Sequence, residues 1–221
     1  ESTDSKALSH ALHRGTNVAM GITILGTIGV SYWLFDSASG NPIGIALSVV
    51  GGLIVGWALG KTAEFYTSDH FAPVKKIAAQ SETGPATTVL SGISAGMVSV
   101  AASVILILVG IGVAYWGGEL TLDDGIYGIA VAAIGMLATT GAVVSVDAYG
   151  PIADNAGGIA EMAELDPSVR EVTDALDSLG NTTAAIAKGF AVGPAALTAL
   201  ALFKSFEYAV VQAGGTLELN V

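Results

Sequence analysis

Three carboxylates recur at seven-residue intervals in the second half of the 221-residue chain. Asp147, Asp154 and Glu161 lie in the stretch VDAYGPIADNAGGIAEMAELD, which directly follows an apolar run. Seven residues make about two helical turns, so the three side chains share one face if the helix continues through Pro151, which is also a candidate kink. An ionised group at membrane depth is costly unless it meets a cavity or a partner, so we expect Asp147 to line a polar cavity.

A second polar set follows in the segment GNTTAAIAKGF. Asn181 and Lys188 are also seven residues apart and share a face of the helix that we expect to begin at Asn181. Thr182 and Thr183 would then lie in its first turn, where backbone N–H groups are unsatisfied. A helix N-terminus beside a lysine is a suitable site for an anion.

The two sets together suggest phosphoryl chemistry. The side chains of Asp147, Asp154 and Asn181 offer hard oxygen ligands, which suit Mg²⁺ held by a few carboxylates, waters and substrate phosphates. Lys188 would hold the anion that Mg²⁺ bridges to the carboxylates.

Plainer readings exist for each residue. Asn181 could serve only as a helix N-cap, and Lys188 could extend toward the membrane interface. The remaining acidic residues of the stretch are expected to be solvated: Asp166, Glu171, Asp174 and Asp177. The three histidines have no carboxylate at a ligand-like spacing, and we predict that they are interfacial or exposed: His10, His13 and His70.

Five apolar segments could position these residues by crossing a membrane, since a spanning helix needs about 20 mainly apolar residues. They are 15–35, 42–65, 86–116, 125–150 and 181–211. The runs are too long and too continuous for barrel strands, so we predict an all-α bundle of transmembrane helices. The longer connections, 66–85 and 151–180, are expected to be loops, with a polar loop or a short helix around the acidic residues of the second.

The composition agrees with a membrane protein. Hydrophobic residues make up 52% of the chain, charged residues only 12%, and there are 29 glycines. Closely packed membrane helices tolerate glycine well. With no cysteine there can be no disulfide or thiolate site, and a net charge of −11 argues against nucleic acid as a partner.

Basic residues indicate the orientation. If the five spans alternate, the N-terminal segment and connections 66–85 and 151–180 share one side, which carries seven of the eight Lys and Arg residues. Only Lys204 falls toward the other side. The excess of positive charge predicts that 151–180 is cytoplasmic.

The motifs DAYGPIADNAGGIAEMA (147–163) and TDALDSLGNTTAAIAKGFAVG (173–193) resemble the membrane-integral pyrophosphatases, which are pyrophosphate-energised ion pumps. A weaker resemblance extends the match to roughly residues 60–205. It implies one segment, 1–221, of a homodimeric pump whose sixteen helices couple hydrolysis of Mg-pyrophosphate to transport of H⁺ or Na⁺ out of the cytoplasm.

The resemblance also implies individual roles. Asp154 and Asn181 correspond to Mg²⁺ ligands, Lys188 to a pyrophosphate contact, and Asp147 to a supporting residue without a defined role. Ala184 stands where potassium-independent members typically carry lysine, so K⁺ is an expected cofactor beside Mg²⁺. Ala187 departs from the glycine usual in the potassium-dependent type.

The family's other acidic motifs, which hold the nucleophilic water, are absent from this sequence. We therefore expect no complete catalytic site here, and we expect the chain, which begins at Glu1 within a polar segment, to be an inactive fragment of a longer protein. A secondary transporter or channel with intramembrane Asp and Lys residues is the alternative. A purely structural membrane domain would leave the polar cluster unexplained.

Overall fold

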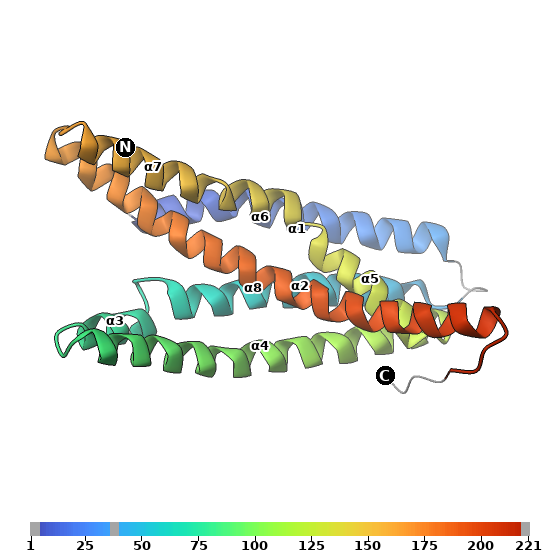
Figure 1. Ribbon diagram of the computed structural model, residues 1–221. Coiled ribbons are helices and arrows are strands. Elements are labelled where there is room, and N and C mark those ends of the chain that lie inside the picture. Colours follow the sequence, from blue (N-terminus) through green and yellow to red (C-terminus); the bar gives the residue numbers. More distant parts are fainter. Residues whose placement is uncertain (1–4, 36–39, 218–221) are drawn as a thin grey trace. The chain divides into compact units, whose positions relative to one another are not determined.

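The computed structural model describes residues 5–35 and 40–217, and every regular element within these ranges is a helix. The predicted all-α fold is therefore confirmed for this part of the chain. In order along the chain (Figure 1), the helices are α1 (Ser5–Leu34), α2 (Pro42–Thr67), α3 (Ala72–Gln80), α4 (Pro85–Leu122), α5 (Gly125–Leu137), α6 (Thr140–Asp147), α7 (Tyr149–Met162) and α8 (Pro167–Gln212).

Several helix boundaries follow from local sequence. The helices α2, α4 and α8 each begin at a proline, which suits a first turn because its missing N–H would lack a helical partner there. Asp124 begins α5 by accepting a hydrogen bond from the backbone N–H of Tyr127 at 3.0 Å. The starts of α2, α4 and α5 therefore coincide with apolar runs of the sequence, whereas α8 begins well before its run.

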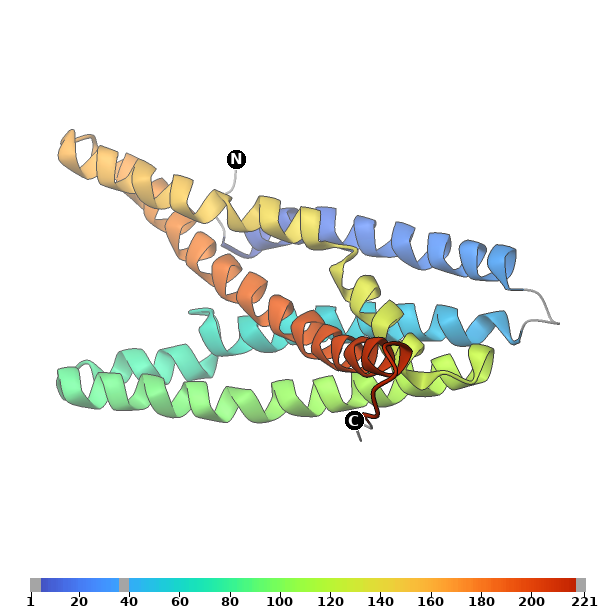
Figure 2. The same ribbon diagram turned by 45° about the vertical axis from the view of Figure 1, so that its right-hand side comes forward.

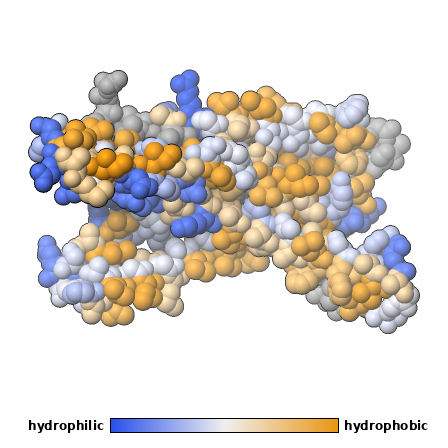
Figure 3. Space-filling view, turned by 45° about the horizontal axis from the view of Figure 1, so that its top comes forward, coloured by the Kyte–Doolittle hydropathy of each residue, from blue (hydrophilic) through white to orange (hydrophobic). Residues whose placement is uncertain are grey.

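Four described helical segments are long and apolar enough to cross a membrane: His13–Leu34, Pro42–Gln80, Pro85–Leu122 and Pro167–Gln212. A fifth candidate span consists of α5 followed by the α6–α7 segment, with a bend of 41° at their junction. This number agrees with the five apolar segments of the sequence. Large apolar side chains are exposed along α4, including Ile93, Met97 and Ile105, and Figure 3 shows apolar residues over much of the face in view.

The described helices belong to two compact units. Unit 1 comprises the described parts of Glu1–Ala19, Leu59–Ser103 and Thr139–Gly189. Unit 2 comprises the described parts of Met20–Ala58, Val104–Ala138 and Phe190–Val221. Each expected span begins in one unit and ends in the other. The N-terminal segment and both longer connections consequently belong to unit 1.

Unit 2 is held together by close helix contacts among α2, α4 and α5. Ser48 donates a hydrogen bond to the carbonyl oxygen of Ala114 at 2.9 Å, and the Thr121 hydroxyl accepts one from the backbone N–H of Ile45 at 3.0 Å. Such bonds tie helix to helix where the surrounding lipid offers no polar partner. Gly52 has no room for a side chain, because an added Cβ would overlap the carbonyl oxygen of Ala132.

The connection 151–180 is not a loop, and this prediction was wrong. Residues up to Met162 belong to α7, and α8 begins at Pro167, so only a short turn separates the two helices. In Figures 1 and 2, α7 and the first part of α8 lie side by side as a hairpin. Eight of the 30 residues in the segment are charged, yet Leu179 is buried and Leu176 half-buried, so the apolar positions that hold a helix against its neighbour are present.

The expected fourth span contains a bend, which lies before the polar stretch. The bend lies between Leu137 and Thr140. After it, α6 and α7 together form the second part of the candidate span, Thr140–Met162. Pro151 does not lie at this bend. It lies in the first turn of α7, two residues after Tyr149, where a missing N–H disturbs little.

Candidate functional site

The candidate site lies on the hairpin that α7 and α8 form within unit 1. Glu164 ends α7 in a left-handed conformation with φ of 51°, and the N–H of Leu165 bonds back to the carbonyl oxygen of Ala160 at 3.1 Å. Asp166 then starts α8 by accepting hydrogen bonds from the hydroxyl and the N–H of Ser168, at 2.6 and 2.9 Å. These bonds stabilise the carboxylate and lower the pKa of Asp166.

Small residues let the two helices approach closely. A Cβ added at Gly180 would lie only 2.6 Å from the Cα of Gly150, so the backbones nearly touch at this level. Ala153 and Ala160 continue the buried face of α7. The hydroxyl of Tyr149 donates a hydrogen bond to the carbonyl oxygen of Leu176 at 3.1 Å. The hairpin is thus fixed by both shape and a polar contact.

The register of the hairpin follows from its ion pair. Arg170 on α8 pairs with Glu161 on α7, across the antiparallel helices. Seven residues back along α7 lies Asp154, and seven residues forward along α8 lies Asp177. Because both steps cover about two turns in the same direction along the hairpin, Asp154 and Asp177 are at the same level and on the same flank.

The structure places the remaining candidates on the two helices of this hairpin and on α6, which precedes it. Asp147 is the last residue of α6 and is half-buried, whereas the side chain of Asp154 is exposed on α7. Asn181 and Lys188 are both exposed and lie seven residues apart on the uninterrupted helix α8. The predicted sharing of a face by Asn181 and Lys188 therefore holds.

Two expectations about Asn181 and its neighbours were wrong. Since α8 begins at Pro167, Asn181 is neither an N-cap nor close to a helix N-terminus, and no helix dipole favours an anion there. The hydroxyls of Thr182 and Thr183 instead donate to the carbonyl oxygens of Ser178 and Leu179, one turn earlier, at 3.2 and 2.8 Å. Any anion at this site must therefore depend on Lys188 and bound cations.

Asp177 differs from the solvated residue that the sequence suggested. Its side chain is half-buried, and its Oδ2 accepts a hydrogen bond from the amide nitrogen of Asn181 at 3.2 Å. Asp166, Glu171 and Asp174 are exposed, as predicted.

The donor set allows a test of the Mg²⁺ assignment. Within residues 5–35 and 40–217, no group of three or more His, Asp or Glu side chains could enclose a metal ion alone. The exposed carboxylate of Asp154 and the Asn181 amide oxygen, left free by the bond from its nitrogen to Asp177, are nevertheless suitable ligands. Mg²⁺ normally keeps waters and phosphate oxygens beside one or two protein carboxylates. The residues present fit Mg²⁺ bound with an anionic substrate, and they do not fit a closed cage.

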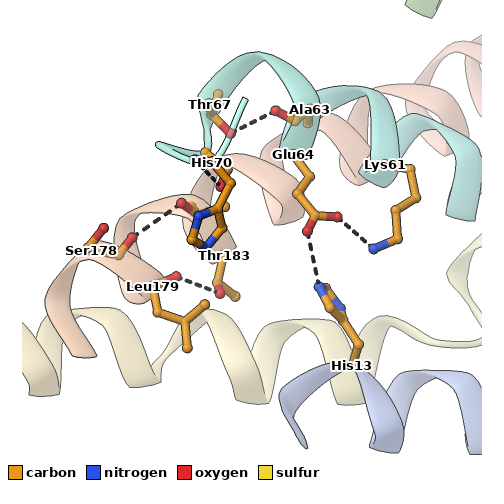
Figure 4. Close-up of polar contacts among 11 residues, drawn as sticks. His13, Lys61, Ala63, Glu64, Thr67, His70, Ser178, Leu179 and Thr183 are labelled. Carbon is orange, nitrogen blue, oxygen red and sulfur yellow. Dashed lines mark hydrogen bonds and ion pairs between the residues drawn. The ribbon is translucent and has the colours of Figure 1, made fainter. Parts of the chain in front are cut away.

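Sequence spacing missed one further polar cluster in unit 1. Figure 4 shows Glu64 of α2 between His13 of α1 and Lys61, with Oε1 of Glu64 at 4.0 Å from His13 Nε2 and Oε2 at 2.6 Å from Lys61 Nζ. The Glu64 side chain is only 17% exposed. His13 thus has a carboxylate neighbour that its sequence spacing does not show, because that neighbour comes from another helix. His70 also lies near a carboxylate, with Nδ1 at 3.7 Å from Asp69.

Comparison with known proteins agrees with this architecture. A family model described as inorganic H+ pyrophosphatase matches residues 1–220. A Clostridium tetani protein assigned by name as a K(+)-stimulated pyrophosphate-energized sodium pump is 54% identical over 90% of this chain. A Bacteroides thetaiotaomicron protein assigned the same name is 48% identical over 93% of the chain. A K(+)-insensitive pyrophosphate-energized proton pump of Methanosarcina mazei is 45% identical over 92%.

The helices and their exposed apolar surface define an integral, multi-pass membrane protein. The match over nearly the whole sequence shows that the chain belongs to the inorganic H+ pyrophosphatase family. It spans between 28% and 30% of the length of the three relatives described above.

Proposed function

We propose that this chain forms part of an ion-translocating membrane pyrophosphatase, which couples hydrolysis of Mg-pyrophosphate to transport of H⁺ or Na⁺ out of the cytoplasm. The observation that carries the proposal is the flank of the α7–α8 hairpin, where Asp154, Asn181 and Lys188 are exposed on adjoining helices of a chain from this family. Family membership makes a secondary transporter the weaker alternative.

Each side chain has a distinct task in this proposal. The carboxylate of Asp154 and the amide oxygen of Asn181 would hold Mg²⁺, which when bound neutralises pyrophosphate and polarises its phosphorus centres. The ammonium group of Lys188 would donate hydrogen bonds to the anion and hold its charge as the phosphoanhydride bond breaks. Asp147 would support the site from the end of α6.

The chain alone is proposed to be inactive. Two oxygen ligands and one lysine leave Mg²⁺ and pyrophosphate with few contacts. The described residues contain no cluster of three or more His, Asp or Glu side chains that could hold the ion by themselves. Further carboxylates, including those that activate the attacking water, are expected from the rest of the full-length protein, for which we propose a homodimer.

The test is hydrolysis of pyrophosphate by membranes that carry the full-length product of the gene encoding this chain. Hydrolysis should require Mg²⁺ and should fall by about 10- to 100-fold in Asp154→Ala and Lys188→Met, because each removes a charged contact to the substrate complex. Lys75→Met, at an exposed lysine of α3, is the matched control and should retain activity. Normal hydrolysis by Asp154→Ala would remove that residue from the site.

A second experiment, which measures transport instead of hydrolysis, identifies the transported ion. Inverted vesicles of the same membranes should accumulate either protons, seen by a pH-sensitive dye, or ²²Na⁺ when pyrophosphate is added. The two relatives at 54% and 48% identity carry sodium-pump names, and the one at 45% carries a proton-pump name. Hydrolysis without accumulation of either ion would contradict the pumping proposal.

A further inference from the structure

The hydrogen bond between Asn181 and Asp177 fixes which way the Asn181 amide points. An ionised carboxylate can only accept hydrogen bonds, so the NH₂ end of the amide must face Asp177. The amide oxygen, at the other end of the planar group, is then directed away from Asp177. This is the oxygen that would bind a metal ion.

The turn of α8 that carries this pair is held more firmly than a free helix surface. One residue before Asp177, the carbonyl oxygen of Leu176 accepts the Tyr149 hydroxyl at 3.1 Å. One residue before Asn181, Gly180 packs against Gly150. Asp177 is half-buried, while Asn181 is exposed. The acceptor therefore lies on the supporting side of the site, and the amide lies on the side that a substrate can reach.

We propose that Asp177 is a positioning residue that holds the Asn181 amide with its oxygen toward Mg²⁺. This inference rests on the proposed function, because it assumes that Asn181 binds the ion. Partners that orient a ligand in this way commonly change metal affinity by about 10- to 100-fold when they are removed. A hydrogen bond that only supports the helix, by contrast, leaves ligand binding unchanged.

The experiment compares four variants of the full-length protein: Asp177→Ala, Asp177→Asn, Asn181→Ala and the double variant Asp177→Ala with Asn181→Ala. Two quantities are measured for each. The first is the Mg²⁺ concentration that gives half-maximal pyrophosphate hydrolysis. The second, independent of turnover, is the rise in thermal stability of the purified protein when Mg²⁺ and a non-hydrolysable diphosphonate are added. Asp174→Ala is the matched control, because Asp174 is an exposed carboxylate of the same helix that pairs with Arg170.

Asp177→Ala should raise the Mg²⁺ requirement about tenfold and reduce the stabilisation by Mg²⁺. Asp177→Asn should be milder, since an amide oxygen still accepts the bond from Asn181. The double variant should match Asn181→Ala, and Asp174→Ala should behave like the parent protein.

Each contrary outcome has a separate meaning. If Asn181→Ala leaves the Mg²⁺ requirement unchanged, the proposed metal site itself is wrong. If Asn181→Ala shifts it and Asp177→Ala does not, only the positioning role fails. If the double variant is much worse than Asn181→Ala, Asp177 binds the ion directly and is not a positioning residue.

Discussion

The hydroxyl of Tyr149 donates a hydrogen bond to the main-chain carbonyl oxygen of Leu176 at 3.1 Å, and this bond joins α7 to α8 beside the candidate site. Tyr149→Phe removes the donor and keeps the ring. We expect the full-length protein to lose about 1 kcal/mol of stability, the usual net value of one hydrogen bond, seen as a lower temperature of half-inactivation. Tyr127→Phe on α5 is the control, and equal loss in both variants would contradict a special role for Tyr149.

The close approach of Gly150 and Gly180 predicts a strong effect of a single methyl group. Gly180→Ala would place a Cβ 2.6 Å from the Cα of Gly150, a distance that the backbones can relieve only by moving apart. We expect a loss of about 1–3 kcal/mol in stability and reduced pyrophosphate hydrolysis. Gly158→Ala is the matched control on α7, because its added Cβ meets nothing within 4 Å. Wild-type stability in Gly180→Ala would show that the helices are not packed this closely.

Ala184 provides a test of potassium dependence. The residue is half-buried on α8, three positions after Asn181, and a lysine there would bring its own ammonium charge toward the site. Ala184→Lys should hydrolyse pyrophosphate without added K⁺ and show no further stimulation by it. We propose that the parent protein is stimulated by K⁺, and Ala184→Ser should keep that stimulation. If K⁺ still stimulates Ala184→Lys, residue 184 does not determine the potassium dependence.

The lowered pKa of Asp166 predicts a pH-dependent start of α8. Its carboxylate accepts two hydrogen bonds from Ser168, so the ionised form is favoured in the folded protein. The stabilisation is complete above the pKa of the unfolded carboxyl group, and it is lost as the pH falls through the lower folded value. The protection of backbone amides in a peptide covering 166–170, taken relative to the unstructured peptide at the same pH, should fall over this acidic range. Asp166→Ala should show low protection at every pH, and a protection profile equal to that of the parent protein would contradict the prediction.

The sidedness of the hairpin can be tested because this sequence contains no cysteine. Seven of the eight basic residues belong to segments of unit 1, which favours a cytoplasmic position for 151–180. In a full-length protein freed of any other cysteines, Glu171→Cys should react with a membrane-impermeant maleimide only in inverted vesicles. Gln212→Cys, at the other end of α8, should react only from the opposite face. Labelling of Glu171→Cys in intact cells would reverse the proposed orientation.

The apolar spans could be predicted from sequence because each run is long and continuous, and length alone distinguishes a spanning helix from a strand. The motifs around Asp154 and Asn181 also indicate the protein family from sequence alone. The start of α8 is not evident from the sequence. Half of the residues from Pro167 to Gly180 are polar or charged and indicate a loop, although Leu176 and Leu179 occupy helix-packing positions.

Contacts between distant segments were also beyond the sequence. Nothing in the spacing of His13 and Glu64 indicates that α1 and α2 bring them together. The role of Asp177 was missed for a different reason. Its distance of four residues from Asn181 becomes meaningful only once both are known to lie inside one helix.

The length of α8 has a consequence for how a charged substrate could arrive. Its 46 residues make a helix about 69 Å long, while the hydrocarbon layer of a bilayer is about 30 Å thick and takes about 20 residues. Roughly half of the helix must therefore lie outside the hydrocarbon layer. We expect the part outside the bilayer to include the beginning of α8, where charged residues gather. Pyrophosphate, which carries several negative charges, could then reach Lys188 from the aqueous phase without shedding its hydration in lipid.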